Sequence, residues 1–528
     1  MKANLWIWVL LALSITVSVA EQPFDFIWAQ RAGGFPNSLA IDGQKNTYVC
    51  GYFYGTALFG STNITSTATS AFLAKHDGEG NFQWVRALGS DSYAEAGAVA
   101  VNASGGVYVA GRFHGVSVSF GNTNLTSNGG GIHEDLFLAK YDTNGTFLWV
   151  QQFPGRPSTS RAVTAAAVDG TGNIYITGNF AQGATFGAFS LSGNVNGSLF
   201  LAKFDSNGTC LWARAASGSL GTYAQGLATD PAGNPILTGH FQGSGSFGTN
   251  NLSSAGSWDI FLMKYNPTGD VLWVRQAGGA DDDYGYGVAV DSGSNIFSVG
   301  MFRNTASFGS TNLTSVGYHD GFITRYSTDG LMSWIRPVRG QASQGLYAFS
   351  VGLDSSGNAY LAGEFKGSAV FGFTNLVSNE TGQPQYFGDI YVAKCSSVGD
   401  FLWATKAGGS SFDAGRVIVL DASGNPYVAG YFSGTANFGQ TNLTSTGAGM
   451  FLGKLDVIPS PSILSLKMYA GLLIQGTPGG TYAIQYVTNL QQTNIWQTLT
   501  TIKMTNASQF WFDVDSPMNP QRFYRSVP

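Results

Sequence analysis

The chain has 528 residues and a formal net charge of -5 at pH 7, and only 11% of its residues are charged, against about 25% in an ordinary globular protein. This scarcity of Lys and Arg argues against a nucleic-acid partner, which needs a concentrated basic surface. Aromatic residues make up 14% of the chain and there are 72 glycines. A chain rich in Ser, Thr, Asn and Gly, with few Lys or Glu, favours β-structure over helices.

The N-terminus has the features of a secretory signal peptide. Lys2 supplies a positive start, an apolar stretch runs from Leu5 to Val17, and Ser18 and Ala20 are small residues at the spacing of a cleavage site. Residues 1–20 are therefore predicted to be removed, which implies a secreted or cell-envelope protein. A membrane anchor is the alternative, but the apolar run is shorter than the span of about 20 residues that a bilayer requires. No transmembrane segment is expected in the mature chain.

Two sequence marks each recur seven times along the chain. One is a tryptophan, at Trp28, Trp84, Trp149, Trp212, Trp273, Trp334 and Trp403. The other is Gly-x-Phe followed by Phe-Gly, as in "GMFRNTASFG" from Gly300. Each copy also contains four alternating apolar segments bounded by Asp, Gly and Asn, which is typical of antiparallel hairpins. Four strands repeated seven times predict an all-β fold, a seven-bladed β-propeller. A stacked solenoid is the alternative, but it would need polar end-caps.

The first and last copies of the repeat are incomplete in complementary ways. The segment "FDFIWAQRAGG" from Phe24 has the tryptophan strand alone, whereas Val417 to Leu455 supplies three strands without a fourth. An open ring would leave two unpaired sheet edges, which promote aggregation. The N-terminal strand is therefore predicted to complete the last blade. The first strands of the repeats are rich in Ala and Gly, as expected for strands that face a crowded central axis.

Several segments resemble a known family of repeats. "DSSGNAYLAGEF", "FLAKYDTNGTFLW" and "NLTS" followed by Gly and Asp are similar to the bacterial seven-bladed propeller repeats called SBBP repeats. The resemblance covers about Phe24 to Asp456. It implies a secreted or cell-surface bacterial protein, and it implies no activity and no catalytic motif. The phrase "YDTNGTFLW" is also similar to the tryptophan-docking repeat of quinoprotein-type propellers, which typically have eight blades.

The propeller is predicted to occupy residues 21–456 and to be followed by a linker, 457–462. Residues 463–528 contain alternating segments such as "TYAIQYV" and "FWFDVD". They predict a small β-sandwich of immunoglobulin or fibronectin type.

The loops between second and third strands, and the links between repeats, are longer and more varied than the hairpin turns. They lie together on one face of a propeller, here called the long-loop face, and any binding site is expected there or in the channel mouth beneath it. The most unusual segment is "GGADDDYGYG", Gly278 to Gly287. Its carboxylates are candidate Ca²⁺ ligands, namely Asp281, Asp282 and Asp283. Tyr284 and Tyr286 are candidates for stacking on a sugar. The alternative is a solvated acidic turn, since the triplet lacks the spacing of an EF-hand loop.

Aspartates also recur just before the third strand, at Asp135, Asp259, Asp320 and Asp389. Their fixed repeat position favours a structural role, in which each accepts hydrogen bonds from its own loop, over a functional ring of carboxylates. The neighbours that vary are better candidates for specificity, and Trp258, His319 and Tyr386 are taken as ligand-binding residues.

No GxSxG, P-loop or HExxH motif occurs, so no catalytic residue is assigned. The sequence predicts an exported, monomeric, non-catalytic binding scaffold that uses the long-loop face, with a polysaccharide or a surface protein as its ligand. The alternative is a carbohydrate-active enzyme, a glycosidase or lyase, with carboxylates at the channel mouth. No cofactor is expected, except Ca²⁺ if the aspartate triplet binds one.

Overall fold

The computed structural model describes residues 8–15, 24–89, 93–128, 133–157, 162–341, 344–379, 388–457, 466–475, 477–487, 496–513 and 523–527. The chain divides into two compact units, one formed by Pro23–Ile458 and the other by Met1–Gln22 together with Pro459–Pro528. Every regular element in the described ranges is a β-strand. A search of those ranges for an apolar helix long enough to cross a membrane finds none.

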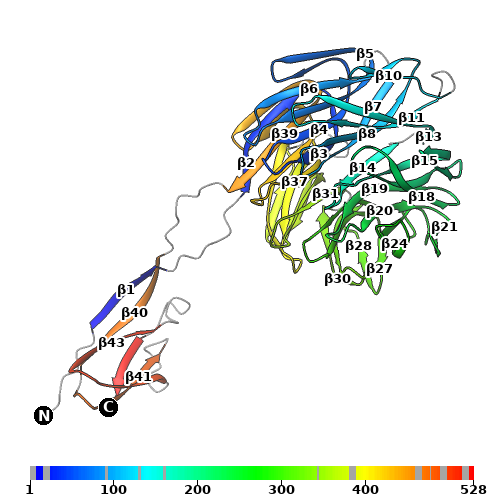
Figure 1. The fold of residues 1–528 in the computed structure, drawn as a ribbon. Helices are drawn as coiled ribbons and strands as arrows, with labels where there is room; N and C mark the ends of the chain where they lie inside the picture. The colour runs from blue at the N-terminus through cyan, green and yellow to red at the C-terminus, as the bar shows by residue number, and fades with distance from the viewer. Residues whose placement is uncertain are drawn as a thin grey trace. The chain divides into compact units, whose positions relative to one another are not determined.

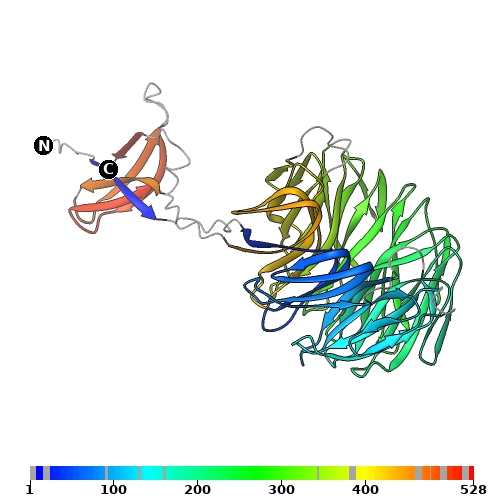
Figure 2. The ribbon, with the colours of Figure 1, turned by 90° about the horizontal axis from the view of Figure 1, so that it is seen from above.

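The larger unit has a propeller arrangement of four-stranded antiparallel sheets (Figures 1 and 2). The first two sheets are β3 (Phe35–Ile41), β4 (Thr47–Phe59), β5 (Thr62–His76) and β6 (Phe82–Leu88), then β7 (Tyr93–Val101), β8 (Val107–His114), β11 (Asp135–Tyr141) and β12 (Phe147–Phe153). The next two are β14 (Val163–Val168), β15 (Ile174–Phe186), β17 (Ser198–Phe204) and β18 (Cys210–Gly218), then β19 (Thr222–Thr229), β20 (Pro235–Phe241), β23 (Asp259–Tyr265) and β24 (Val271–Gly279).

The remaining sheets continue the same order of pairing. They are β25 (Tyr284–Val290), β26 (Ile296–Phe302), β29 (Asp320–Tyr326) and β30 (Met332–Gly340), then β31 (Leu346–Leu353), β32 (Ala359–Phe365), β35 (Asp389–Cys395) and β36 (Phe401–Gly409), then β37 (Ala414–Leu420), β38 (Pro426–Phe438), β39 (Thr441–Val457) and β2 (Phe24–Ala32). Short outer hairpins follow some second strands, for example β27 (Thr305–Phe308) with β28 (Thr311–Thr314). Strand β27 also pairs with the end of β24, which joins neighbouring sheets.

The N-terminal strand β2 pairs antiparallel with β39, the third strand of the final sheet, as the split repeat predicted (Figure 1). Phe26 of β2 is 2% exposed, and its ring lies 5.4 Å from that of Phe438 in an edge-on contact. The first strands of the sheets are here called the inner strands: β3, β7, β14, β19, β25, β31 and β37. Each inner strand contacts the next in this order, and β37 contacts β3. The two ends of the unit are therefore joined at its inner strands as well as through β2.

The repeated tryptophan packs each sheet against the next. Trp84 of β6 donates a hydrogen bond from Nε1 to the carbonyl of Thr143, in the turn between β11 and β12, at 3.2 Å. A Cβ added to Gly145 in that turn would lie 2.8 Å from the indole ring. The equivalent turn glycine of the first sheet, Gly80, lies against Trp28 of β2 in the same way. The tryptophan contact therefore continues across the join between the two chain ends.

The Gly-x-Phe mark has a different structural cause. Each inner strand contains a β-bulge, where its pairing with the second strand shifts by one residue. The glycine of the mark faces this bulge, and a Cβ on Gly300 would lie only 1.9 Å from the carbonyl oxygen of Tyr284. The phenylalanine of the mark is buried in the sheet core, as for Phe302. The Gly-x-Phe mark is therefore a consequence of the bulge in the inner strand.

The smaller unit contains two three-stranded sheets. One has the order β1 (Trp8–Ile15), β40 (Leu466–Gln475), β43 (Ser508–Asp513), and the other has β42 (Gln497–Lys503), β41 (Thr481–Val487), β44 (Phe523–Val527). Ile484, Ile502 and Met504 form a small buried cluster. Strand β1 belongs to the segment predicted to be a signal peptide, so cleavage after Ala20 would leave β40 paired with β43 alone.

Candidate functional site

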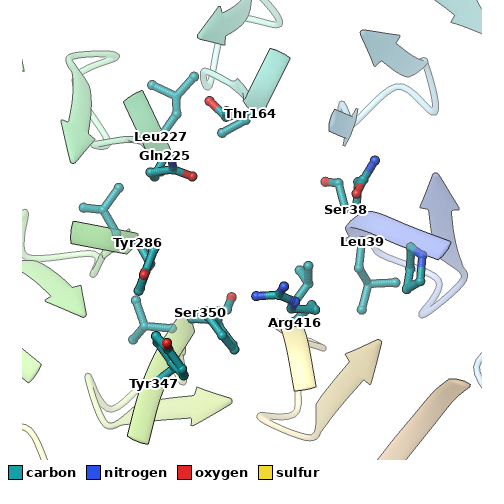
Figure 3. A pocket seen from close by; sticks show the side chains of 18 of the residues that line it. Ser38, Leu39, Thr164, Gln225, Leu227, Tyr286, Tyr347, Ser350 and Arg416 are labelled. Carbon is teal, nitrogen blue, oxygen red and sulfur yellow. The ribbon is translucent and has the colours of Figure 1, made fainter. Parts of the chain in front are cut away.

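A cavity of about 670 Å³ lies among the inner strands of the larger unit. Its lining includes residues from all of the inner strands, and Figure 3 shows side chains from opposite strands pointing into the shared space. Pockets of 300–1,000 Å³ are usual for small-molecule ligands. The size and central position of this cavity make it the candidate functional site.

The lining includes residues that stand at the β-bulges of the inner strands. The bulge residues are Asn37, Gly97, Thr164, Gln225, Tyr286, Phe349 and Arg416. All of them except Gly97 line the cavity. A bulge leaves one residue unpaired and redirects its side chain, which is why bulges recur beside binding sites. Their neighbours are mostly Ala, Gly, Ser and Val, whereas the bulge residues differ in chemistry from sheet to sheet. One repeated backbone feature thus presents a varied set of side chains to one space.

The aromatic side chains gather on one half of the cavity, on β25, β31 and β37 and next to them. The lining aromatic residues are Tyr286, Tyr347, Phe349, Phe412 and Tyr431. Tyr286 lies 5.4 Å from Phe349 between ring centroids, and Tyr347 stacks on Phe349 at 5.2 Å. The half formed by β3, β14 and β19 carries Asn37, Ser38, Thr164 and Gln225 instead. The cavity therefore has an aromatic half that faces an uncharged polar half (Figure 3).

Arg416 projects into the cavity from β37 (Figure 3). Its guanidinium carbon lies 4.1 Å from the ring centroid of Phe349 and 5.1 Å from that of Tyr431. Its Nε is buried without a hydrogen-bond partner in the described part of the protein. Contact with aromatic rings stabilises a guanidinium through cation–π attraction and uses none of its N–H donors.

Glu364 and Lys366 complete the charged part of the lining. Glu364 is 4% exposed, and the Lys366 Nζ lies 3.8 Å from its Oε1. Burial raises the pKa of Glu364 to about 7, although the nearby cations Lys366 and Arg416 act in the opposite direction. Glu364 is the only carboxylate among the described residues that line the cavity.

Burial raises the pKa of other carboxyl groups in this part of the unit: to about 7 for Asp283 and Asp413, and to about 6 for Asp389. A group whose pKa is higher in the folded state stabilises the fold fully below its unfolded pKa of about 4, and this contribution is lost as pH rises through the folded pKa. For each such group this loss runs from about pH 4 to the folded pKa of about 6–7, at about 1.4 kcal/mol per pH unit. Burial lowers the pKa of His76 and His319 to about 4 and of His240 to about 3, so these groups destabilise the fold as pH falls below about 6.5 and oppose the carboxyl effect there. The net decline in stability is therefore clearest above about pH 6.

Asp413→Asn tests this pH dependence. The Asp413 carboxylate accepts hydrogen bonds from the backbone N–H groups of Gly409 and Ser433 at 2.7 and 3.2 Å, and its side chain is otherwise desolvated. Thermal unfolding between about pH 5 and pH 9 should show a smaller decline for Asp413→Asn than for the unmodified protein. The exposed Glu79→Gln serves as the control and should leave the decline unchanged. Parallel curves for Asp413→Asn and the unmodified protein would contradict this assignment.

The residues predicted to bind ligand divide between the cavity and its surroundings. Tyr286 lines the cavity. Tyr284 lies 6.0 Å from Tyr286 between ring centroids and 4.5 Å from His240, which in turn contacts Trp258 at 5.2 Å. Trp258 also packs against Tyr223 and is not fully exposed. Trp258 and Tyr284 therefore support the cavity wall through ring contacts, while Tyr286 alone of these three lines the cavity.

His319 is 5% exposed and lies 4.1 Å from Tyr347, with both ring nitrogens buried and without hydrogen-bond partners in the described ranges. Its lowered pKa keeps it neutral at pH 7, because of burial first and of the cations Lys366 and Arg303 second. It packs behind the aromatic half and is not part of the lining. Tyr386 lies outside the described residues.

The structure does not gather the aspartate triplet around a common point. Asp281 accepts a hydrogen bond from Asn304 at 2.8 Å and Asp282 from Ser257 at 2.5 Å. Asp283 is buried and accepts from the backbone N–H groups of Gly279 and Arg303. No group of three acidic, histidine or cysteine side chains in the described ranges is placed to hold a metal. The Ca²⁺ hypothesis therefore gains no support, because a different donor engages each carboxylate, and most of these donors belong to neighbouring loops.

The aspartates before the third strands have the structural role favoured by their repeat position. Backbone N–H groups of the preceding loop donate to each of them: Asn128 to Asp135, Ala255 to Asp259, Val316 to Asp320 and Asn379 to Asp389, at 2.8–3.0 Å. They hold the loops in shape and do not line the cavity.

Sequence reasoning missed Tyr347, Phe349, Glu364 and Arg416. A signal for the bulge residues was nonetheless present, because each stands five positions before the Asp or Asn that opens the first hairpin turn, as Arg416 stands before Asp421. At this position the chain reads Asn, Gly, Thr, Gln, Tyr, Phe and Arg in successive repeats. The inner strands are otherwise uniform in sequence, and the residue type varies at this one position. Such variation indicates a site to which each repeat contributes a different side chain.

Comparison with known proteins is consistent with this architecture. Residues 272–301 match the family model described as "Beta-propeller repeat" (SBBP). The chain is 24% identical over 442 residues to "Uncharacterized WD repeat-containing protein L264" of Acanthamoeba polyphaga mimivirus, in a match that covers 67% of this chain and 32% of the relative. The chain thus spans about a third of the length of that relative.

Solved structures show weaker likenesses. Sqt1 from Chaetomium thermophilum is 10% identical, with 79% of this chain and 97% of that chain covered and a TM-score of 0.39. XC5397 from Xanthomonas campestris, described as a gluconolactonase, is 12% identical, with 66% and 91% covered and a TM-score of 0.31. Likenesses with TM-scores below 0.5 carry no inference about this chain. The matched repeat model and the arrangement of the sheets together support a β-propeller repeat protein.

Proposed function

We propose that the larger unit is a closed seven-bladed propeller that binds a carbohydrate in its central cavity without catalysing a reaction. The pairing of β2 with β39 and the contact of β37 with β3 support closure of the ring. The observation that carries the function is the set of bulge residues, which places an aromatic half opposite a half of amide and hydroxyl groups.

This arrangement matches the two surfaces of a sugar. The faces of a pyranose ring expose C–H groups that pack on aromatic rings such as Tyr286 and Phe349, since these supply a large apolar contact area. The hydroxyl groups at the edge of the sugar need donors and acceptors. Gln225 has both, whereas Asn37 and Thr164 offer acceptor oxygens, because they donate to Glu95, Ala96 and Thr177. A polysaccharide end or a short oligosaccharide is therefore the ligand class that fits the lining best.

The lining favours binding over hydrolysis. A typical glycosidase needs two carboxyl groups that flank the scissile bond and lie about 5–10 Å from each other. Among the described lining residues only Glu364 has a carboxyl group, and Lys366 lies beside it. Asp283 and Asp413 accept backbone hydrogen bonds away from the lining. A carbohydrate-active enzyme remains the alternative that the same assay distinguishes.

Retention on a panel of immobilised polysaccharides, with released products measured in parallel, tests the proposal. The unmodified protein is expected to be retained on at least one polysaccharide without releasing new chain ends. Tyr286→Ala should weaken that binding about tenfold or more, as expected when an aromatic anchor is removed from a binding pocket. Tyr54→Ala, an exposed tyrosine (72%) that does not line the cavity, should bind normally. Release of chain ends would favour the enzyme, and no retention on any polysaccharide would contradict carbohydrate binding.

We also propose that the protein is exported to the cell envelope or the medium and that the smaller unit is a β-sandwich. The signal-peptide features of residues 1–20 support export, and the three-stranded sheet β42–β41–β44 together with the β40–β43 pair supports the sandwich in the cleaved protein. The N-terminal residue of the exported protein tests the first of these and is expected to be Glu21. A mature protein that still begins at Met1 would contradict cleavage.

A further inference from the structure

We infer that the carbohydrate bound in the cavity carries a carboxylate, as a hexuronic acid does, and that Arg416 recognises it. This inference rests on the proposed carbohydrate-binding function and names the chemical class of the ligand.

Arg416 contacts two aromatic rings of the cavity lining. Phe349 and Tyr431 lie against its guanidinium, at 4.1 and 5.1 Å. No ion pair or hydrogen bond joins its guanidinium to another residue in the described ranges, and its Nε is buried without a partner. A buried donor left unpaired costs free energy, and native proteins rarely leave one so. An anion that lies in the plane of the guanidinium would satisfy these donors.

Arg325 shares this state, because its Nε is buried without a partner in the described ranges and its guanidinium lies 5.7 Å from the ring centroid of Phe297, but it does not line the cavity. Three other stacked arginines of the unit differ from both. Arg86, Arg214 and Arg275 also lie over an aromatic ring, the tryptophan of the same strand, at 5.2–5.6 Å. Each of these donates to carbonyl oxygens of the next sheet's turn, as Arg275 Nε does to Gly330 at 2.7 Å. They are thus fully used in packing one sheet on another. Arg416 has the aromatic stacking without the acceptors, and it lines the cavity.

The charges of the lining indicate which kind of anion fits the cavity. The cations of the lining, Arg416 and Lys366, are close to a single acid, Glu364, whose raised pKa leaves it partly protonated near neutral pH. The opposite half of the cavity is uncharged. A single cationic region that faces neutral amide and hydroxyl groups suits a ligand with one acid group and several hydroxyl groups on each sugar ring. A densely charged polyanion would find no further cations there.

The geometry of a guanidinium decides between carboxylate and hydroxyl as its partner. Its parallel N–H donors match the two oxygens of a carboxylate, and such charge-assisted pairs are about twice as strong as neutral hydrogen bonds. The contacts with Phe349 and Tyr431 restrict the guanidinium, so less side-chain entropy is lost on binding. A uronate ring that packs on the aromatic half would present its carboxylate at its edge, where Arg416 lies.

Isothermal titration with tetragalacturonate and with its fully methyl-esterified form tests the inference, because the two probes share their ring and linkage and differ in charge. The unmodified protein should bind the acid at least about tenfold more tightly than the ester at low salt, and the preference should shrink as salt is raised. Arg416→Gln should bind both forms equally. Arg416→Lys, which retains charge but loses the paired donors, should keep only part of the preference.

Arg31→Gln, an exposed arginine outside the lining, is the matched control and should keep the full preference. Tyr286→Ala should weaken binding of both forms. Equal affinity of the unmodified protein for acid and ester would overturn the carboxylate inference and leave carbohydrate binding intact. Binding of neither form, with retention on a neutral polysaccharide, would overturn it in the same way. Tighter binding of tetraglutamate than of any saccharide would overturn both the inference and the proposed function.

Discussion

Replacing Phe26 with alanine is expected to lower the free energy of unfolding of the larger unit by about 3–5 kcal/mol. Phe26 is 2% exposed and packs in the core of the final sheet, where its ring contacts that of Phe438. It stands on β2, whose pairing with β39 joins the two ends of the unit. Its removal should therefore leave a cavity in the core and weaken the closure of the ring. Urea-induced unfolding followed by tryptophan fluorescence measures the effect.

The adjacent residue supplies the control. Ile27 is 44% exposed, so Ile27→Ala changes the same strand without removing core packing and should alter stability by no more than about 0.5 kcal/mol. Similar losses for both variants would mean that β2 tolerates any change poorly for reasons other than core packing. A loss below about 1 kcal/mol for Phe26→Ala would contradict the importance of β2 in closing the ring.

Gly300→Ala is expected to cost about 3 kcal/mol of stability, at the upper end of the usual range for overpacking. The added Cβ would lie 1.9 Å from the carbonyl oxygen of Tyr284, which is backbone and cannot rotate away. The bulge of β25 must shift to relieve the contact, and Tyr286 is the residue that this bulge projects into the cavity. The variant should therefore also bind the saccharide ligand more weakly.

Unfolding and titration on the same sample separate these two effects. Gly43→Ala is the control, because Gly43 has no atom within 4 Å of an added Cβ, and it should change neither stability nor binding appreciably. Wild-type stability in Gly300→Ala would contradict the bulge as the reason for the Gly-x-Phe mark. Lost stability with normal affinity would show that the bulge does not position Tyr286.

The strands could be predicted from the sequence because they rest on local patterns. Alternating apolar residues between Asp-Gly and Asn-Gly turns specify hairpins within a few residues, wherever they occur in the chain. The split repeat also required only counting, since the strand around Trp28 lacked partners and the segment before Leu455 lacked one strand. Both observations led to the β2–β39 pair.

The site was predicted only in part, for a reason that the bulges make clear. In a strand with regular alternation, the side chain at the bulge position would point away from the channel or into the sheet core. In the sequence, Phe349 and Arg416 therefore look like ordinary strand residues. The bulge inserts one residue and redirects its side chain, and nothing in a single strand reveals this. Conversely, the aspartate triplet stood out in the sequence, yet Ser257 and Asn304 of neighbouring loops engage two of its carboxylates.

The sequence by itself determined the all-β class, the four-strand repeat and the partners of the two chain ends, because hydrogen-bonded hairpins and buried apolar faces follow from near neighbours in the chain. The tertiary structure alone decided which side chains share the central cavity. Tyr286, Phe349 and Arg416 are more than 60 residues apart in succession, and they meet only because successive sheets pack side by side around one centre. Their chemistry as a group, an aromatic wall with one unpaired guanidinium, exists only in the folded protein.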